Sequence, residues 1–262
     1  MAKSMGILDF IMPQNLRCIF CSDEADNYGI CDNCYKSLPF IKGRTCRICG
    51  GRIDKFDVCN QCVEYAHKYE QNYCVLDYVD EIAMKIIQFK QFHHKIIGNT
   101  LAHLMCKYYD NLNLKADIII PVPIHPQRLK ERKFNQSEIL VSEIAKKYGN
   151  VYTNILTRVK DTPHQTGLSR ANRLNNLSDA FEVIDRKKVK GKTILLVDDI
   201  YTTGSTLDEC ASVLYKCGAS HVYGLCLARG LVDNKRAEEY LRPFSFRQKL
   251  SQNNCLNISK SV

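Results

Sequence analysis

Runs of apolar residues predict the strands of an α/β fold. Residues 117–121 and 194–197 are almost continuously apolar, which is typical of parallel strands whose two faces are both covered. A further short strand is expected at 73–78. Because parallel strands need crossover connections, we expect helices between them.

Apolar residues recur at helical spacing in the intervals between these strands. Segments 81–92 and 95–109 each show such a face, and so does the segment that follows the last strand. Another helix is expected to begin at Asn135, which can cap it together with Glu138 three residues later. The pattern as a whole predicts a parallel sheet with flanking helices.

The most informative stretch follows the strand at 194–197. Two carboxylates, Asp198 and Asp199, stand where that strand should emerge into a crevice. A short hydroxyl-rich turn then leads into a helix, and it consists of Thr202, Thr203, Gly204, Ser205 and Thr206. Backbone N–H groups at a helix start, with the helix dipole behind them, favour a phosphate. Because neighbouring carboxylates suit ribose hydroxyls, the stretch predicts a sugar-phosphate site.

This turn differs from a Walker loop, since it lacks the lysine and the longer glycine spacing. The alternative is an ordinary strand–turn–helix unit without a ligand. Two adjacent acids at the end of a buried strand would then carry an uncompensated desolvation cost. The ligand interpretation is therefore favoured.

The stretch resembles the signature of type I phosphoribosyltransferases, which bind 5-phosphoribosyl-1-pyrophosphate (PRPP). The resemblance implies a phosphoribosyltransferase type I-like fold in which Asp198 and Asp199 hold the ribose hydroxyls and the turn holds the 5′-phosphate. It also implies that Asp199 helps to orient or deprotonate a nucleophile, and that Mg²⁺ bridges the pyrophosphate. Tyr201 stands where most members carry an aliphatic residue, and it is expected only to pack or to line the entrance.

In that family, the loop after the first core strand binds pyrophosphate. A proline-stiffened loop at 121–126 takes this place, and the cations to test after it are Arg128, Arg132 and Lys133. Guanidinium groups suit phosphate because they bind it in a bidentate manner. Lys90 is expected at the surface, with a phosphate ligand as the alternative.

Residues 158–173 are rich in Gly, Pro, Thr and Ser and show little periodicity, which is typical of a mobile loop. Family members have a flexible loop here that closes over PRPP and excludes water. The resemblance implies that Gln165, Arg170 and Arg173 approach PRPP on closure. The alternative is a solvated linker.

Eight of the 14 cysteines occur before residue 65 as two copies of one spacing. The copies are Cys18, Cys21, Cys31 and Cys34, then Cys46, Cys49, Cys59 and Cys62. Each C-x-x-C pair offers two thiolates to one ion, and two pairs complete a tetrahedral zinc site. Since four thiolates leave no open position, the zinc is expected to be structural. Two sequential ribbons are the simpler pairing, and a cross-brace is the alternative.

A disulfide framework is the competing interpretation of these cysteines. Residues 1–12 lack a basic start followed by a long apolar run, so no signal peptide is expected. A chain that stays in reducing surroundings favours metal binding. No run approaches the ~20 apolar residues of a membrane span. We therefore expect a cytoplasmic protein with two structural Zn²⁺ ions.

The net charge of +9 is unevenly distributed, because acids and bases balance within residues 1–65. A basic body suits polyanions such as nucleic acid or phosphorylated ligands. The expected organisation is a double zinc-ribbon module at 15–66, a helical connector at 67–112, a phosphoribosyltransferase-like domain at 113–230 and a largely disordered tail at 231–262.

Together the motifs resemble the ComF/ComFC family, bacterial proteins associated with DNA uptake during natural transformation. The cysteine pairs precede Pro-Val-Pro-Ile-His at 121–125, Lys-Phe-Asn-Gln at 133–136, Thr-Pro-His-Gln-x-x-Leu-Ser-Arg-x-x-Arg at 162–173 and Val-Asp-Asp-Ile-Tyr-Thr-Thr-Gly at 197–204. The resemblance implies a PRPP-binding protein that handles incoming single-stranded DNA with other DNA-uptake proteins. The alternatives are an active phosphoribosyltransferase that acts on a nucleobase or amide nitrogen, and a sensor that binds PRPP without turnover.

Overall fold

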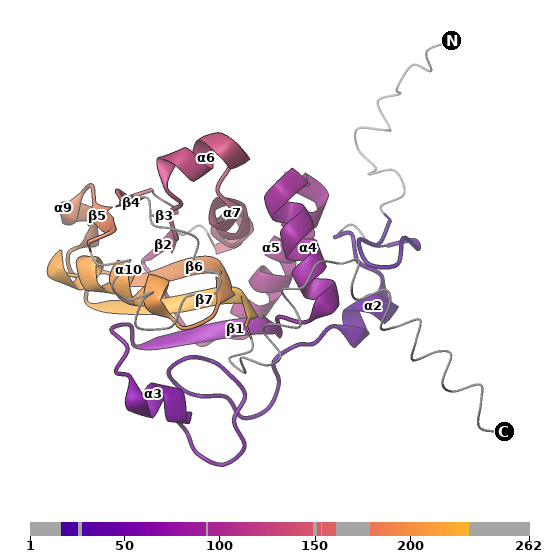
Figure 1. Ribbon diagram of the computed structural model, residues 1–262, viewed down its shortest axis with the longest axis horizontal. Coiled ribbons are helices and arrows are strands. Elements are labelled where there is room, and N and C mark those ends of the chain that lie inside the picture. The colour runs from indigo at the N-terminus through magenta and orange to yellow at the C-terminus, as the bar shows by residue number, and fades with distance from the viewer. Residues whose placement is uncertain are drawn as a thin grey trace, which may run out of the picture.

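The computed structural model describes residues 17–25, 28–92, 94–148, 151–152, 154–160 and 179–230. Its centre is a five-stranded parallel sheet in the order β1-β7-β6-β2-β3 (Figure 1). The strands are β1 (Gln71–Asp77), β2 (Ile118–Pro121), β3 (Val151–Tyr152), β6 (Thr193–Tyr201) and β7 (His221–Arg229). A second, antiparallel sheet pairs β4 (Leu156–Arg158) with β5 (Phe181–Val183). The predicted α/β class with a parallel sheet is confirmed.

Helices cover both faces of the central sheet (Figure 1). One face carries α4 (Asp80–Phe92), α5 (Lys95–Tyr109) and α7 (Gln136–Tyr148), and the other carries α10 (Ser205–Lys216). Alternate residues of β6 pack into the two layers: Leu195 and Val197 into the first, Ile194 and Leu196 into the second. All four are fully buried. The apolar run is continuous because a strand covered on both faces has no solvent-facing positions.

The remaining described helices are short: α2 (Asp32–Ser37), α3 (Asn60–Glu64), α6 (Pro126–Arg132) and α9 (Arg186–Val189). Helix α7 starts as predicted, since Asn135 Oδ1 accepts a hydrogen bond from the Ser137 N–H at 3.1 Å. Within the described ranges, every helix is too short or too polar to cross a bilayer.

The cysteine-rich segment packs along the outer edge of the sheet. Residues 39–41 run beside β1, where the Ile41 N–H donates to the Val75 carbonyl at 3.0 Å and the Asp77 N–H donates to the Pro39 carbonyl at 2.9 Å. Three cysteines of the first group, Cys18, Cys31 and Cys34, pack in the layer of α4, α5 and α7, and all four of the second group pack in the layer of α10. The module therefore covers an edge strand that would otherwise expose unpaired backbone groups.

Strand β1 comes from the expected connector at 67–112 and pairs with β7 in the central sheet. The boundaries of the four expected segments stay predictions. Two expected regions lie outside the described residues. One is most of the loop at 158–173, which includes Gln165, Arg170 and Arg173, and the other is the tail at 231–262.

Candidate functional site

The candidate site lies at the carboxyl ends of β6 and β2. Strand β6 connects through α10 to β7 on one side of the sheet, whereas β2 connects through α7 to β3 on the other side. Ligands of open parallel sheets bind where the connections diverge in this way. The end of β6 and the starts of α7 and α10 supply the residues of the site.

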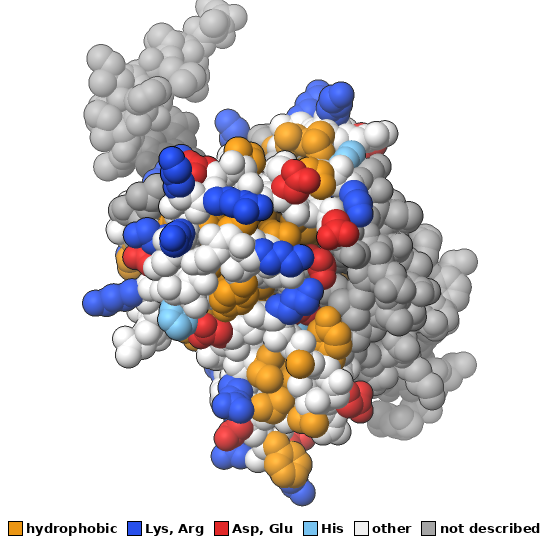
Figure 2. All heavy atoms as spheres, turned by 90° about the vertical axis from the view of Figure 1, so that its left-hand side faces the viewer, with side chains coloured by type: hydrophobic (Ala, Val, Ile, Leu, Met, Phe, Trp, Pro, Cys, Tyr) orange, Lys and Arg blue, Asp and Glu red, His pale blue; other side chains and the backbone are white. Residues whose placement is uncertain are grey.

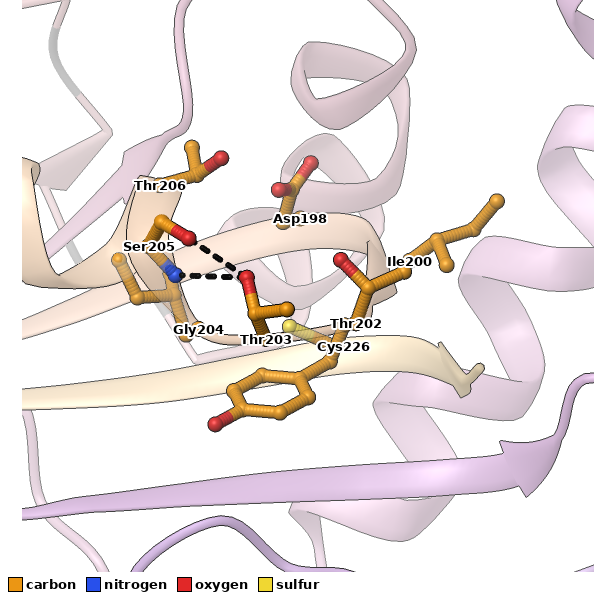
Figure 3. Close-up of a pocket in the computed structure, with 10 residues that line it drawn as sticks. Asp198, Ile200, Thr202, Thr203, Gly204, Ser205, Thr206 and Cys226 are labelled. Atoms are coloured by element: carbon orange, nitrogen blue, oxygen red, sulfur yellow. Dashed lines mark hydrogen bonds between the residues drawn. The ribbon is translucent and has the colours of Figure 1, made fainter. Parts of the chain in front are cut away.

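One wall of the site is the turn at 202–206, which we call the phosphate turn. Gly204 adopts a left-handed conformation (φ +82°) and is the N-cap of α10, and it offers no side chain to cap the helix. The Ser205 N–H donates a long hydrogen bond of 3.5 Å to Thr203 Oγ1. Thr203 Oγ1 lies 2.5 Å from Ser205 Oγ, and the five residues of the turn line a common pocket with Asp198 (Figure 3). Because the first N–H groups of a helix have no partner within the helix, this arrangement favours an anion.

The two acids belong to β6, which continues to Tyr201 instead of ending at the acids as expected. Asp198 Oδ1 accepts hydrogen bonds from the Ser137 hydroxyl at 3.2 Å and from the Asp199 N–H at 2.8 Å. Asp199 does not line the same pocket. Its Oδ2 atom instead forms an ion pair with Lys90 Nζ at 2.7 Å. The neighbouring acids therefore have different environments.

Lys90 and Ser137 are the site residues that sequence reasoning did not assign. Lys90 was expected at the surface, but its side chain is only 23% exposed and reaches Asp199 from α4. Its only local signal is that it follows the fully buried Phe89. Ser137 could have been noticed because it lies in the first turn of a capped helix that follows the expected pyrophosphate loop. Both contacts depend on how α4 and α7 pack against the sheet.

Asp198 has an unusual proton affinity. Burial and, next, the charge of Asp199 raise the pKa of the Asp198 carboxyl to about 7, although Lys90 and the hydrogen bond from Ser137 act in the opposite direction. A carboxyl group with this pKa is partly protonated at neutral pH. Its capacity to accept hydrogen bonds from a ligand therefore rises with pH.

We expect the PRPP affinity contributed by Asp198 to increase between about pH 6 and pH 8, because the carboxylate forms in this window. PRPP titrations of the wild type and Asp198→Asn across this range measure the effect. The phosphates of PRPP also titrate, and the variant shows how much of the pH dependence they cause. Identical pH profiles for the two proteins would contradict the assignment. The stability of the fold should depend on pH in the opposite direction. Because the pKa of Asp198 is raised in the folded state, its contribution to the free energy of unfolding is full below the pKa of the unfolded chain and is lost as pH rises through about 7.

The cations expected to bind pyrophosphate lie on α6 and at its end. Arg132 Nη1 donates to Gln136 Oε1 at 3.5 Å, which ties Arg132 to the first residue of α7 beside Ser137. Lys133 ends α6 in the left-handed conformation with φ +66°. Ligand contacts by Arg128, Arg132 and Lys133 stay predictions.

Replacing Lys133 with glycine is expected to give a fold about 1 kcal/mol more stable than replacing it with alanine, because glycine adopts this positive φ without strain. Both variants lose the ammonium group. Thermal unfolding reports the backbone effect, and PRPP titration of the same pair reports the charge effect. If Lys133→Gly is the less stable of the two, the backbone argument is wrong.

The eight paired cysteines form two sequential groups, as the simpler pairing predicted. Each group brings its four sulfur atoms within 4.8 Å of one another, and the groups are Cys18, Cys21, Cys31 and Cys34 (the first zinc site) and Cys46, Cys49, Cys59 and Cys62 (the second zinc site). The sulfurs of Cys21 and Cys31 are 3.6 Å apart, and those of Cys49 and Cys59 are 3.7 Å apart. Tetrahedral zinc with Zn–S bonds of about 2.3 Å requires separations of about 3.8 Å. Both groups therefore fit a structural Zn²⁺ ion.

Family models match both parts of the chain. Residues 7–63 match a double zinc ribbon domain, and residues 89–243 match a phosphoribosyl transferase domain. The second match covers more than half of the chain and includes the acids and the phosphate turn. The predicted combination of a phosphoribosyltransferase-like fold with an N-terminal double zinc ribbon is confirmed.

Solved structures give more distant similarities. An adenine phosphoribosyltransferase is 16% identical with a TM-score of 0.35, over 58% of this chain and 79% of that one. Glutamine PRPP amidotransferase from B. subtilis is 18% identical with a TM-score of 0.38, over 53% of this chain and 30% of that one. Because these scores are low, the family assignment depends on the sequence matches.

Relatives match over half of the chain or more. Competence protein F of Haemophilus influenzae is 32% identical over 230 residues, which cover 82% of this chain and 97% of that protein. DNA utilization protein YhgH of Escherichia coli O157:H7 is 30% identical over 212 residues, covering 78% and 92%. Competence protein ComFC of Streptococcus pneumoniae is 30% identical over 135 residues, covering 52% and 56%. With its double zinc ribbon and phosphoribosyltransferase domain, the chain belongs to the ComF/ComFC family.

Proposed function

We propose that this protein binds PRPP in the pocket formed by Asp198 and the phosphate turn. The observation that carries the proposal is the glycine-capped start of α10 beside two carboxylates at the point where the sheet connections diverge. The turn would hold the 5′-phosphate, and Asp198 and Asp199 would hold the ribose hydroxyls. Carboxylate oxygens are also ligands that Mg²⁺ accepts, so a magnesium complex of PRPP fits this set of donors.

The role of PRPP binding, in our proposal, is in the handling of incoming single-stranded DNA in the cytoplasm, together with other DNA-uptake proteins. The names of the relatives support a role in competence or DNA utilization. Basic side chains are prominent on the face shown in Figure 2. Along the chain, exposed basic residues are concentrated in and just after α9, namely Arg186, Lys187, Lys188, Lys190 and Lys192. Such a cluster supports contact with a nucleic-acid backbone.

Calorimetric titration with PRPP and Mg²⁺ tests the binding proposal. We expect saturable binding at one site per chain, and weaker binding of ribose 5-phosphate, which lacks the pyrophosphate. Ribose should not bind measurably, because it has no phosphate group with which the phosphate turn could interact. If PRPP itself does not bind, the proposal is refuted.

Catalysis of phosphoribosyl transfer is the second candidate function. Asp199 is half-buried next to Asp198, which lines the pocket, and Asp199 forms an ion pair with Lys90. In this reaction a nitrogen nucleophile attacks C1 of PRPP, the C1–O bond breaks and pyrophosphate leaves, with Asp199 orienting or deprotonating the nucleophile. A pyrophosphate-release assay with a panel of nucleobases and ammonia tests it. Release establishes an enzyme, whereas PRPP binding without release leaves the DNA-handling role or a PRPP sensor.

Single-stranded DNA binding should be measured at several salt concentrations. Contacts between basic side chains and phosphates release counterions, so the affinity should fall steeply as salt increases. An affinity that does not change with salt would argue against backbone contacts.

A further inference from the structure

A short segment between the second zinc site and β1 lies directly against the phosphate turn. A Cβ atom placed on Gly204 would lie 2.5 Å from Tyr201 Oη, 2.8 Å from His67 Cε1 and 2.9 Å from Tyr69 Oη. These distances are shorter than van der Waals contact, so the backbone of the turn packs directly on three side chains. Tyr69 and Tyr201 are almost completely buried.

Hydrogen bonds tie this segment to both ends of the turn. His67 Nδ1 lies 2.8 Å from Asp208 Oδ2, and the Lys68 N–H donates to Asp208 Oδ1 at 2.7 Å. Asp208 is fully buried in the first turn of α10. On the other side of the turn, the hydroxyls of Tyr69 and Tyr201 are 2.6 Å apart. The segment therefore holds the residue before the phosphate turn and the helix after it.

Arg229 connects the same tyrosine to the second zinc site. It pairs with Tyr201 in the sheet register, and its guanidinium carbon lies 4.6 Å from the centroid of the Tyr201 ring. A Cβ placed on Gly51, two residues after the ligand Cys49, would lie 2.5 Å from Arg229 Nε. Arg229 is 8% exposed, and within the described residues its Nη1 atom has no hydrogen-bond partner.

A buried guanidinium needs a compensating negative charge. A zinc ion held by Cys46, Cys49, Cys59 and Cys62 would supply one, since a complex with four thiolates has a net charge of about −2. Loss of the ion would also release the loop that carries Gly51, whose backbone packs directly against the Arg229 side chain. The environment of Arg229 therefore depends on whether the second site holds its metal, and Arg229 transmits that dependence to Tyr201.

We propose that the second zinc site positions the phosphate turn through Arg229, Tyr201 and the segment that bears His67 and Tyr69. Zinc at this site and a phosphate ligand at the turn then strengthen each other's binding. The inference rests on the proposed function, because it takes PRPP as the ligand. The first zinc site packs in the layer on the opposite face of the sheet and serves as an internal control.

Coupling between two sites is reciprocal, so a ligand that binds more tightly to the zinc form must also retain the zinc. The test follows zinc release from the full chain into a chromogenic chelator, with and without PRPP, at constant Mg²⁺. We expect PRPP to slow release from the second site by about fivefold or more and to leave the first site unchanged. The variant Cys21→Ser, which disrupts the first site, assigns the two kinetic phases.

Two further variants separate positioning from general stability. Tyr201→Phe removes one hydroxyl from the contact with Tyr69 and is expected to reduce the protection of zinc by PRPP while both zinc ions still bind. Tyr73→Phe, on β1, removes a hydroxyl outside this network and should retain full protection. Arg229→Met should abolish the protection, and Arg229→Lys should restore part of it because the positive charge returns.

The outcomes distinguish the two proposals. If PRPP binds to the wild type but leaves both release rates unchanged, or slows both equally, the coupling is refuted and PRPP binding stands. If PRPP does not bind, both proposals fail. If PRPP slows zinc release equally in Tyr201→Phe and Tyr73→Phe, the Tyr201 hydroxyl does not take part in the coupling between the second zinc site and the phosphate turn.

Discussion

Simultaneous replacement of Asp198 and Asp199 by asparagine should weaken PRPP binding by about 10²–10⁴-fold and leave both zinc ions in place. A hydrogen bond to a charged group contributes about 1.5–3 kcal/mol, and each carboxylate would accept one from the ribose. Asparagine keeps the shape and removes the charge. Calorimetry with PRPP and Mg²⁺ measures the affinity, and metal analysis gives the zinc content.

The matched control is Asp54→Asn with Glu182→Gln, which removes two charges from exposed positions elsewhere in the chain. It should bind PRPP as the wild type does. Unchanged affinity in the Asp198 and Asp199 variant would refute the assignment of the site. A loss of zinc in that variant would instead indicate general unfolding.

The second large effect is expected for Cys46→Ser, which should lose one zinc ion per chain and much of the stability of the fold. Structural zinc sites contribute binding free energies of about 10–16 kcal/mol, comparable to the whole free energy of unfolding of a domain. Cys46 is completely buried and packs in the layer that contains α10. The damage should therefore extend from the ribbon to the central sheet.

Cys21→Ser provides the comparison, because Cys21 is an exposed ligand of the first zinc site. It should also lose one zinc ion, but with a smaller decrease in melting temperature. Thermal unfolding of both variants, with zinc quantified per chain, checks this order. Equal melting temperatures would contradict the argument from burial.

Local patterns were sufficient for the features that depend on neighbouring residues. The apolar run before Asp198 predicted the central strand, and the repeated cysteine spacing predicted two metal sites, with sequential pairing as the simpler of two possibilities. The cap at Asn135 and the turn around Gly204 were also recognisable from residue type and order. Each of these features is specified by a few consecutive residues.

Features that depend on long-range packing were not predictable in this way. Lys90 and Asp199 are more than a hundred positions apart, and nothing around either residue indicates the other. Tyr201 was expected only to pack or to line the entrance. It does line the pocket, but its hydroxyl also contacts the hydroxyl of Tyr69, which lies just before the edge strand β1. Such contacts become visible only after the order of the strands is known.

The backbone contacts between residues 39–41 and β1 have a consequence for dissecting this protein. A fragment without the zinc ribbons would begin with β1, a strand of seven residues whose unpaired outer edge could pair with strands of other chains. Such a fragment would self-associate, and a loss of ligand binding by it would therefore reveal nothing about the contribution of zinc. Point substitutions at the metal ligands, made in the intact chain, are the informative way to separate the two halves.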